Sequence, residues 1–421
     1  MLNLNSNKIN RFKKLLDSYS YDLITQTLAD RPYINLDSYL SEKKGEILIK
    51  LFYFQKKFLI RELECNFGQK YIDELLQLGV LIRNNNYISS LLKIHSLFNL
   101  YFASSYVDYR ALDYAYFGKD SLLLSHYLPY NFKSSSTLDL CTGTGVQAIL
   151  MANNSTSIIG TDISPIAQNI AQFNVLLNNV EDRVKIINGN IYEPIGKKKF
   201  DLIISNPPYI SIPNSFEYPI CGNGGEDGLL ILKKIISDLD LHLNQSGVSL
   251  ILGNTIGNDK EPFIVDYLKS NLMKFGWDIE IVVIEKHPKE EEMFNRTLLL
   301  TNHNIVSSKN AQAEFQNMYE RLNVTNTYIY LLRIKKGKGS IKKTNIFENS
   351  INEKISKVTD VTSFKTIEFL MINSFNNGHY KRVVELYKVI DKFHTTFNIP
   401  YTKELLYIIN QSQGKQSIKK T

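Results

Sequence analysis

The chain has 421 residues, of which 43% are hydrophobic and 22% are charged, a composition typical of a globular protein with two or three domains. Its three cysteines, Cys65, Cys141 and Cys221, lie far apart without a C-x-x-C pair, so we expect no metal site, no disulfide framework and a reducing, cytoplasmic location. The sequence has no signal-peptide pattern at its N-terminus and no apolar run long enough to cross a bilayer, so we expect no membrane partner.

The net charge of +7 is distributed unevenly along the chain. Residues 1–105 carry +4, residues 336–421 carry +8, and the middle segment, residues 106–335, carries −5. A polyanion-binding surface is therefore expected on the flanks rather than around a central site. The same three segments are the domains that we predict.

The first segment, residues 1–105, predicts a small helical domain that ends in a hairpin. Residues 1–40 are weakly helical, and apolar positions from 47 to 54, RELECNF at 61–67 and QKYIDELLQLG at 69–79 predict three helices. VLIRNNNYISS at 80–90 contains two short strand-like runs around three asparagines, which is a hairpin signal. Three helices followed by a hairpin is the order of a winged helix.

The middle segment, residues 106–335, alternates strand-like and helix-like stretches. The strand-like runs are TLDLC, SIIGTDI, VKIINGN, FDLIISN, VSLILGN, IEIVVIE and YIYLLRI. This alternation predicts an α/β fold in which helices cover a parallel sheet. The last segment begins with KKGKGSIKKTN at 335–345, which predicts a linker, and continues as a basic helical domain broken at 376–378.

A glycine-rich turn follows the first of these strands. Gly143, Gly145 and Ala148 form a G-x-G-x-x-A pattern between a strand and a helix. The next strand ends at Asp162, whose carboxylate is suited to ribose hydroxyls, and the third ends at Asn190, whose amide is suited to an adenine amino group. The glycines alone leave open a dinucleotide-binding dehydrogenase or a turn without a ligand.

The fourth strand leads into Asn206-Pro207-Pro208-Tyr209, the most informative motif of the chain. Two prolines stiffen the loop and remove two N–H donors, which leaves carbonyl acceptors projecting from it. The Asn206 side chain and the Pro207 carbonyl are suited to hold both hydrogens of a planar NH2 group, and Tyr209 offers a flat face for stacking. Such a grip positions a nitrogen for in-line attack.

The stretch from 137 to 230 closely resembles the HemK/PrmC family of protein-glutamine N5-methyltransferases. LDLCTGTG, TDISPIAQNIAQFN, IYEPIGKKKFDLIISNPPYI and GNGGEDGL resemble that family's motifs in order and at similar spacing, and YFGKDSLLLSHYL resembles a stretch of adenine-N6 methyltransferases of the same superfamily. The resemblance implies a seven-stranded Rossmann-like sheet of the class I type and S-adenosylmethionine as cofactor, with S-adenosylhomocysteine as product.

The resemblance also implies which residues form the site. The cofactor-binding residues would be Asp139, Thr142, Gly143, Thr144, Gly145, Asp162, Ile163, Asn190, Ile191 and Asn206. The catalytic residues would be Asn206, Pro207, Pro208 and Tyr209. Position 190 departs from the family, where Asp is usual, and the flanking segments do not resemble the family, so the resemblance leaves the substrate open.

We therefore expect methyl transfer to a nitrogen or oxygen of a peptide or protein, at a side-chain amide or a C-terminal carboxylate. Winged-helix elements bind leader peptides in ribosomal peptide natural-product pathways, which makes a lanthipeptide-type C-terminal carboxyl methyltransferase one candidate. The alternatives are an adenine-N6 methyltransferase of RNA or DNA, gripping phosphates through the basic flanks, and a regulator that binds the cofactor without transferring methyl. The sequence does not predict an oligomeric state.

The N-terminal segment is expected to select the substrate. Its predicted wing at 80–90 offers an edge strand to which an extended peptide can pair. Asp73 and Glu74 lie on the helix that a nucleic acid would use, where they would repel phosphate.

Overall fold

The computed structural model describes residues 1–22, 25, 43–106, 111–272, 276–302, 307–346, 383–384, 387 and 407–411. The predicted break in the C-terminal helical domain at 376–378 lies outside these residues, as does most of the segment from 336 onward. That part of the domain prediction therefore stays a prediction.

The N-terminal segment contains the predicted helices and hairpin in the predicted order. The elements are α1 (Ser6–Ser18), α4 (Lys43–Phe52), β1 (Phe58–Leu59), α5 (Ile60–Phe67), α6 (Gln69–Leu78), β2 (Leu81–Asn84) and β3 (Tyr87–Ser90). Helix α6 ends at Gly79, whose left-handed backbone (φ 74°) lets its N–H bond back to the last turn. The three strands form a sheet in the order β1-β3-β2, in which β2 is an outer strand.

A two-stranded ribbon that the sequence did not predict connects this segment to the rest. It consists of β4 (Leu92–Leu97) and β5 (Leu100–Ser105), paired antiparallel. The turn between them is made by Phe98 and Asn99, both with positive φ (51° and 62°). A two-residue hairpin turn of this kind is normally marked by glycine, so a turn that begins with phenylalanine gives little sequence signal.

The central segment forms one large sheet that contains all seven predicted strands. Its elements are α7 (Lys119–Tyr127), β6 (Ser134–Leu140), α8 (Val146–Leu150), η1 (Met151–Asn153), β7 (Ser155–Asp162), α9 (Pro165–Leu177), β8 (Val184–Asn188), η2 (Glu193–Ile195), β9 (Phe200–Ser205), α10 (Leu230–His242), β10 (Leu243–Gly257), α11 (Ile264–Asn271), β11 (Trp277–Pro288), α12 (Lys289–Asn302), α13 (Ser308–Arg321), β12 (Asn326–Lys336) and β13 (Ser340–Asn345). The strand order is β13-β11-β12-β10-β9-β6-β7-β8. Strands β6 to β10 run parallel, and β12 lies antiparallel between β10 and β11. The prediction of a Rossmann-like class I methyltransferase sheet is confirmed.

The eighth strand corrects two expectations, the strand count of seven and the linker at 335–345. Residues 340–345 form β13, which pairs in parallel with β11 from Asp278↔Ser340 to Val283↔Asn345. The Asp278 carboxylate fixes the preceding turn by accepting hydrogen bonds from Lys338 N (3.2 Å) and Ser340 Oγ (2.7 Å). Because an edge strand with one polar face needs few apolar residues, its sequence resembles a linker.

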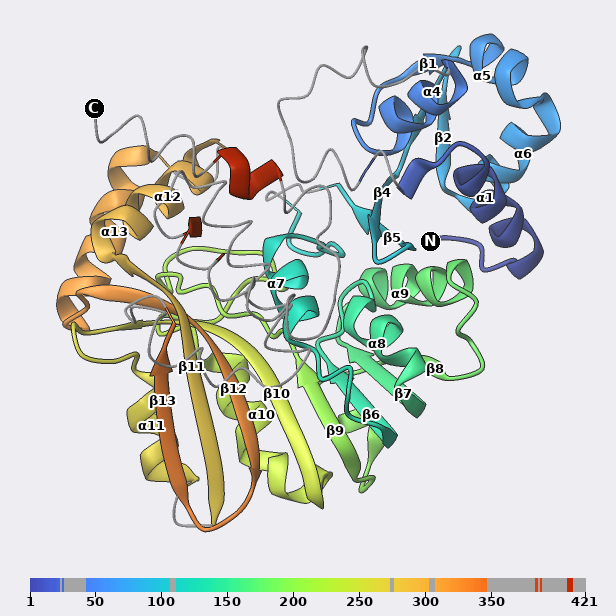
Figure 1. Cartoon of the computed structure of the whole chain (residues 1–421). Coiled ribbons are helices and arrows are strands. Elements are labelled where there is room, and N and C mark those ends of the chain that lie inside the picture. The colour runs from blue at the N-terminus through green and yellow to red at the C-terminus, as the bar shows by residue number, and fades with distance from the viewer. Residues whose placement is uncertain are drawn as a thin grey trace.

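Helices cover both faces of the sheet (Figure 1). Alternate residues of each strand point to opposite faces, so Ile203 packs with α10 and α11, whereas its neighbours Leu202 and Ile204 pack with α7, α8 and α9. Helices α12 and α13 pack together with Ile212 and Tyr218, which lie in the long loop after β9. In Figure 1 this helix pair and the N-terminal helices lie at opposite ends of the sheet.

Helix α9 joins the N-terminal segment to the sheet. One side of the helix, with Ala171 and Val175, packs on the sheet, while Ile170, Phe173 and Leu177 belong to the core of the N-terminal segment. Two asparagines one turn apart add polar contacts to the backbones of β5 and the glycine loop. Asn174 accepts from Ala103 N (2.7 Å) and donates to the carbonyls of Ala103 and Thr144 (both 2.9 Å), and Asn178 accepts from Tyr101 N (3.0 Å) and donates to Tyr101 O (2.7 Å). The helix thereby continues the hydrogen bonding of β5.

We predict that Asn174→Ala lowers the free energy of unfolding by about 2–4 kcal/mol, because it leaves several buried backbone groups without partners. Urea unfolding followed by circular dichroism measures the change. Asn169→Ala is the matched control, since this half-buried asparagine of the same helix bonds only to Leu2 and should cost less than about 1 kcal/mol. Equal losses for both variants would contradict the bridging role of Asn174.

Candidate cofactor and acceptor site

Four parallel strands end side by side and bring the predicted motifs together. Strand β6 pairs with β9 up to Leu140↔Ser205 and with β7 up to Leu140↔Thr161, and β7 pairs with β8 up to Asp162↔Asn188. Residues that follow these strand ends therefore share one edge of the sheet. This is the edge at which open α/β sheets bind ligands.

The glycine loop is fastened to the end of β7 through Asp162. The carboxylate accepts hydrogen bonds from Gly143 N (2.8 Å) and Ser164 N (2.9 Å). Gly143 and Gly145 both have left-handed backbones, with φ of 54° and 79°, so a side chain at either position would strain the turn. Burial raises the pKa of Asp162, and these two backbone hydrogen bonds oppose the rise.

Asp139 stabilises the same loop from the end of β6. It is 1% exposed, and its Oδ2 accepts hydrogen bonds from Thr142 Oγ1 and Ala148 N (3.1 Å). Burial raises its pKa to about 7. Asp139 therefore holds the turn in shape, and a direct contact with the cofactor stays a prediction.

The surroundings of Asp162 fit the adenosine part of S-adenosylmethionine. Ile163 is 57% exposed directly beside Asp162, which leaves an apolar face for a planar base. Asn190 and Ile191 lie across from it, and Thr161 Oγ1 donates to Ile191 O (2.9 Å) and holds this segment against β7. The Thr144 hydroxyl is buried in the loop without a hydrogen-bond partner, as expected of a group that a ligand satisfies.

The loop after β9 is held by the glycine-rich stretch GNGGEDG. Ile210 N donates to Gly222 O (2.8 Å) and Gly224 N donates to Ile210 O (2.9 Å). A Cβ at Gly224 would lie 2.6 Å from the Tyr209 backbone, and one at Gly228 would lie 2.7 Å from Tyr209 O. Glycine is therefore required where this stretch packs behind the Asn-Pro-Pro-Tyr loop.

The Asn206 side chain makes one hydrogen bond and has one buried acceptor. Its Nδ2 donates to Asp120 Oδ2 on α7 (2.9 Å), whereas its Oδ1 is buried without a partner. Burial raises the pKa of Asp120, while the hydrogen bonds from Asn206, the backbone of α7 and the Tyr209 hydroxyl lower it. The amide is thereby oriented with its donor engaged and its acceptor available.

Tyr209 lies among groups from three parts of the chain. Burial raises its pKa well above 10, the charges of Asp120 and Tyr116 raise it further, and Arg296 on α12 opposes them. Arg296 is itself paired with Glu292 of the same helix (2.6 Å). Helix α12 therefore contributes to the surroundings of the Asn-Pro-Pro-Tyr loop.

Sequence reasoning did not single out Asp120 or Arg296. The stretch around Asp120 resembled other methyltransferases, but an aspartate in the first turn of a helix is also a common helix-stabilising residue. Arg296 followed a run of glutamates typical of a solvated surface. Only the fold, in which α7 and α12 lie near the end of β9, shows that Asp120 and Arg296 are more than a helix-stabilising residue and a surface residue.

Comparisons with known proteins agree with this geometry. The methyltransferase small domain family matches residues 114–255. A putative protein N5-glutamine methyltransferase of Methanocaldococcus jannaschii is 33% identical over 182 residues, which cover 42% of this chain and 86% of that protein. The chain belongs to the HemK/PrmC-like family of S-adenosylmethionine-dependent methyltransferases.

Two further relatives match only in part. A bifunctional methyltransferase of Rickettsia bellii is 32% identical over 42% of this chain and 35% of that protein. A ribosomal protein uL3 glutamine methyltransferase of Francisella tularensis is 34% identical over 29% of this chain and 42% of that protein. The chain thus spans less than half the length of these two relatives.

In the described part of the chain, no three or more His, Cys, Asp or Glu side chains gather as a metal site. None of the helices in these residues is both long and apolar enough to cross a membrane.

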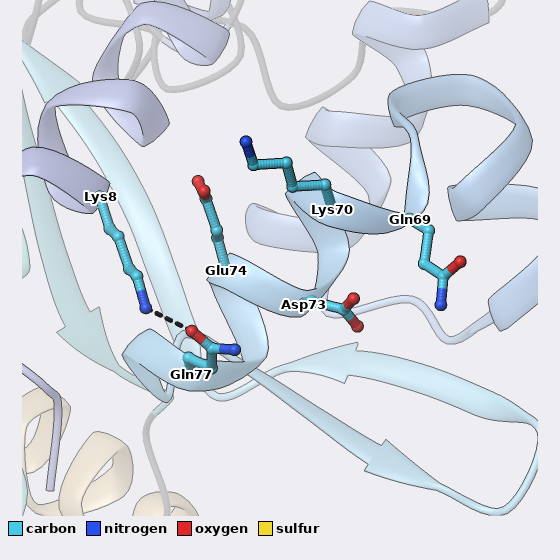
Figure 2. A pocket seen from close by; sticks show the side chains of 6 residues that line it. All are labelled: Lys8, Gln69, Lys70, Asp73, Glu74 and Gln77. Carbon is cyan, nitrogen blue, oxygen red and sulfur yellow. Dashed lines mark hydrogen bonds between the residues drawn. The ribbon is translucent and has the colours of Figure 1, made fainter.

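A groove of about 440 Å³ lies on the N-terminal segment, away from the strand ends (Figure 2). Its lining is formed by Lys8, Gln69, Lys70, Asp73, Glu74 and Gln77. Glu74 accepts hydrogen bonds from both Arg11 Nε (2.8 Å) and Arg11 Nη2 (2.9 Å). Because Arg11 neutralises Glu74, this helix repels phosphate less than its sequence alone suggests.

We predict that Asp162→Ala weakens binding of S-adenosylmethionine and S-adenosylhomocysteine by about 1.5–3 kcal/mol, the loss expected for hydrogen bonds to a charged group. Isothermal titration calorimetry measures both affinities. Asp182→Ala, an exposed carboxylate beyond α9, is the control and should bind normally. Unchanged affinity in Asp162→Ala would mean that the glycine loop is not the cofactor site.

Proposed function

We propose that the chain transfers a methyl group from S-adenosylmethionine to the side-chain amide nitrogen of a protein or peptide, with glutamine as the modified residue. The observation that carries the proposal is the orientation of the Asn206 amide, whose Nδ2 is bonded to Asp120 and whose buried Oδ1 lacks a partner. A buried acceptor of this kind calls for an N–H donor on the substrate.

Methyl transfer of this kind depends on the position of the substrate nitrogen more than on the strength of an acid or base catalyst. When bound, S-adenosylmethionine supplies a methyl group on a positively charged sulfur that is a good leaving group. Asn206 Oδ1 and the Pro207 carbonyl would each accept one hydrogen of the substrate NH2, while Tyr209 stacks on the amide plane. This grip aims the nitrogen at the methyl group, and the methylated nitrogen then loses one proton to solvent.

A carboxylate acceptor, as in a lanthipeptide-type C-terminal methyltransferase, suits this arrangement less well. Asn206 would have to turn its NH2 toward the substrate, which would break its hydrogen bond to Asp120 and leave two acceptor oxygens facing each other. The Asp120 carboxyl would also place an acidic group behind the site. The O-methyl alternative is therefore disfavoured.

An adenine amino group would fit the same grip, so the adenine-N6 alternative depends on the rest of the molecule. The central segment carries −5, which opposes a nucleic-acid backbone near the site. The relatives named above as glutamine methyltransferases favour a protein substrate. A labelled-RNA acceptor in parallel with protein acceptors separates the two.

We predict that Asn206→Ala abolishes methyl transfer to protein acceptors, a loss of at least about 1,000-fold in kcat, while the protein stays folded. Label transfer from S-adenosylmethionine to ribosomal protein uL3, total cell protein and total RNA measures the activity.

Asn244→Ala is the matched control for this experiment. Asn244 likewise donates its Nδ2 to a carboxylate, Asp201 Oδ1 (2.8 Å). This pair lies where β9 and β10 begin, whereas the candidate site lies where the parallel strands end. It should retain normal turnover. Near-normal kcat in Asn206→Ala would show that the loop is only structural, and labelling of RNA instead of protein would favour the alternative.

We also propose that the N-terminal segment selects the substrate as a winged-helix-like module. Leu59, Ile82 and Tyr87 are each exposed by 45% or more, and the register places them on one face of the small sheet. Strand β2 is an outer strand of that sheet. An extended substrate segment can pair with β2 and cover this apolar face.

We predict that Ile82→Lys lowers kcat/KM for the protein acceptor about tenfold, the loss of one partly buried apolar contact, without changing turnover of a short glutamine peptide. Leu241→Lys, which replaces an exposed leucine on α10, is the control. Point variants are used because deleting residues 1–105 would uncover Ile170, Phe173 and Leu177 of α9. Equal loss with both acceptors would contradict a role in selection.

A further inference from the structure

The hydrogen bond between α7 and the Asn-Pro-Pro-Tyr loop has a consequence for substrate choice. We infer that Asp120 is a positioning residue that fixes the orientation of the Asn206 amide and thereby selects N–H acceptors over carboxylates. The inference rests on the proposed function, and it assigns a role to a residue outside the Asn-Pro-Pro-Tyr motif.

The geometry supports this role at both ends of the contact. Asp120 Oδ2 accepts from Asn206 Nδ2 at 2.9 Å, and this bond joins residues 86 positions apart. A carboxylate only accepts hydrogen bonds, so it bonds to the NH2 end of the amide and turns Oδ1 away from itself. Without Asp120, the two ends of the Asn206 amide would differ little in energy.

The position of Asp120 is itself fixed. Asp120 lies in the first turn of α7, whose residues Leu123 and Leu124 are buried in the core above the sheet. Gln147 Nε2, from the helix after the glycine loop, donates to Ser121 O (3.2 Å). The helix after the glycine loop and the Asn-Pro-Pro-Tyr loop are therefore both hydrogen-bonded to the first turn of α7.

The acceptor atom that remains is the one that a substrate would need. Asn206 Oδ1 is buried without a partner. An unsatisfied buried acceptor favours a ligand that brings an N–H donor and disfavours one that brings only oxygen lone pairs. A primary amide meets this demand, whereas the corresponding carboxylate does not.

Replacement by asparagine should relax the selection. The NH2 of an asparagine at position 120 can donate to Asn206 Oδ1, which lets Asn206 turn its own NH2 toward the substrate. The same change removes the acidic group. Asp120→Asn should therefore keep part of the amide activity and gain activity on a carboxylate, whereas Asp120→Ala should lose activity without this gain.

The experiment compares wild type, Asp120→Ala and Asp120→Asn on a peptide cut from the labelled acceptor protein and on the same peptide with glutamate at the modified position. We expect kcat on the glutamine peptide to fall about 10- to 100-fold in Asp120→Ala and less in Asp120→Asn. The glutamine-to-glutamate ratio of kcat/KM should fall at least about tenfold in Asp120→Asn. The affinities of both peptides are measured with S-adenosylhomocysteine present. The ratio of these affinities should shift in the same direction as the ratio of kcat/KM.

Asp201→Asn and Asp201→Ala are the matched controls, because Asp201 accepts from Asn244 far from the site and should leave the ratio unchanged. Normal kcat in Asp120→Ala would overturn the inference, as would equal losses in both Asp120 variants with an unchanged ratio, since that is the result of a purely structural role. If Asp120→Ala fails to fold, the ratio in Asp120→Asn still decides. Failure of wild type to methylate any glutamine peptide would instead overturn the proposed function.

Discussion

Parallel pairing of β6 with β9 on one side and β7 on the other is the constraint on which the site depends. Because the strands run in the same direction and end within one residue of each other in register, the glycine loop, Asp162 and the Asn-Pro-Pro-Tyr loop meet at one edge. The Ser205 hydroxyl adds a hydrogen bond to Leu140 O (2.8 Å) at the point where the two loops diverge. The two loops to which we assign the methyl donor and the methyl acceptor are brought together by this pairing.

The structure outside the sheet stabilises that edge from two directions. Asn174 donates to Thr144 O in the glycine loop and also pairs with Ala103 of β5, so the N-terminal segment is coupled to the glycine loop through one side chain. On the other side, α12 and α13 pack with Ile212 and Tyr218 of the loop after β9. The segments on either side of the stretch from 137 to 230 thus pack against residues that lie next to the two loops.

The sequence predicted the seven strands and the glycine and proline motifs because each has a strong local signal: an apolar run, a tight turn or a rigid dipeptide. It did not reveal β13, whose polar sequence with Ile341 as its one apolar residue resembles a linker until it is seen paired with β11. It also did not reveal Asp120, because the hydrogen bond to Asn206 joins two elements that are distant in sequence. Motifs within one segment could be predicted from the sequence, whereas contacts between elements distant in sequence could be seen only in the fold.

The most direct test of the account is the chemical form of the transferred methyl group. Acceptor protein labelled by the wild-type chain from methyl-tritiated S-adenosylmethionine is divided into two portions, one hydrolysed in strong acid and one treated with mild base. We expect acid to release the label as methylamine, the product of an N-methylated amide, and mild base to release none. Release of labelled methanol by base would identify a methyl ester and would contradict the proposed orientation of Asn206.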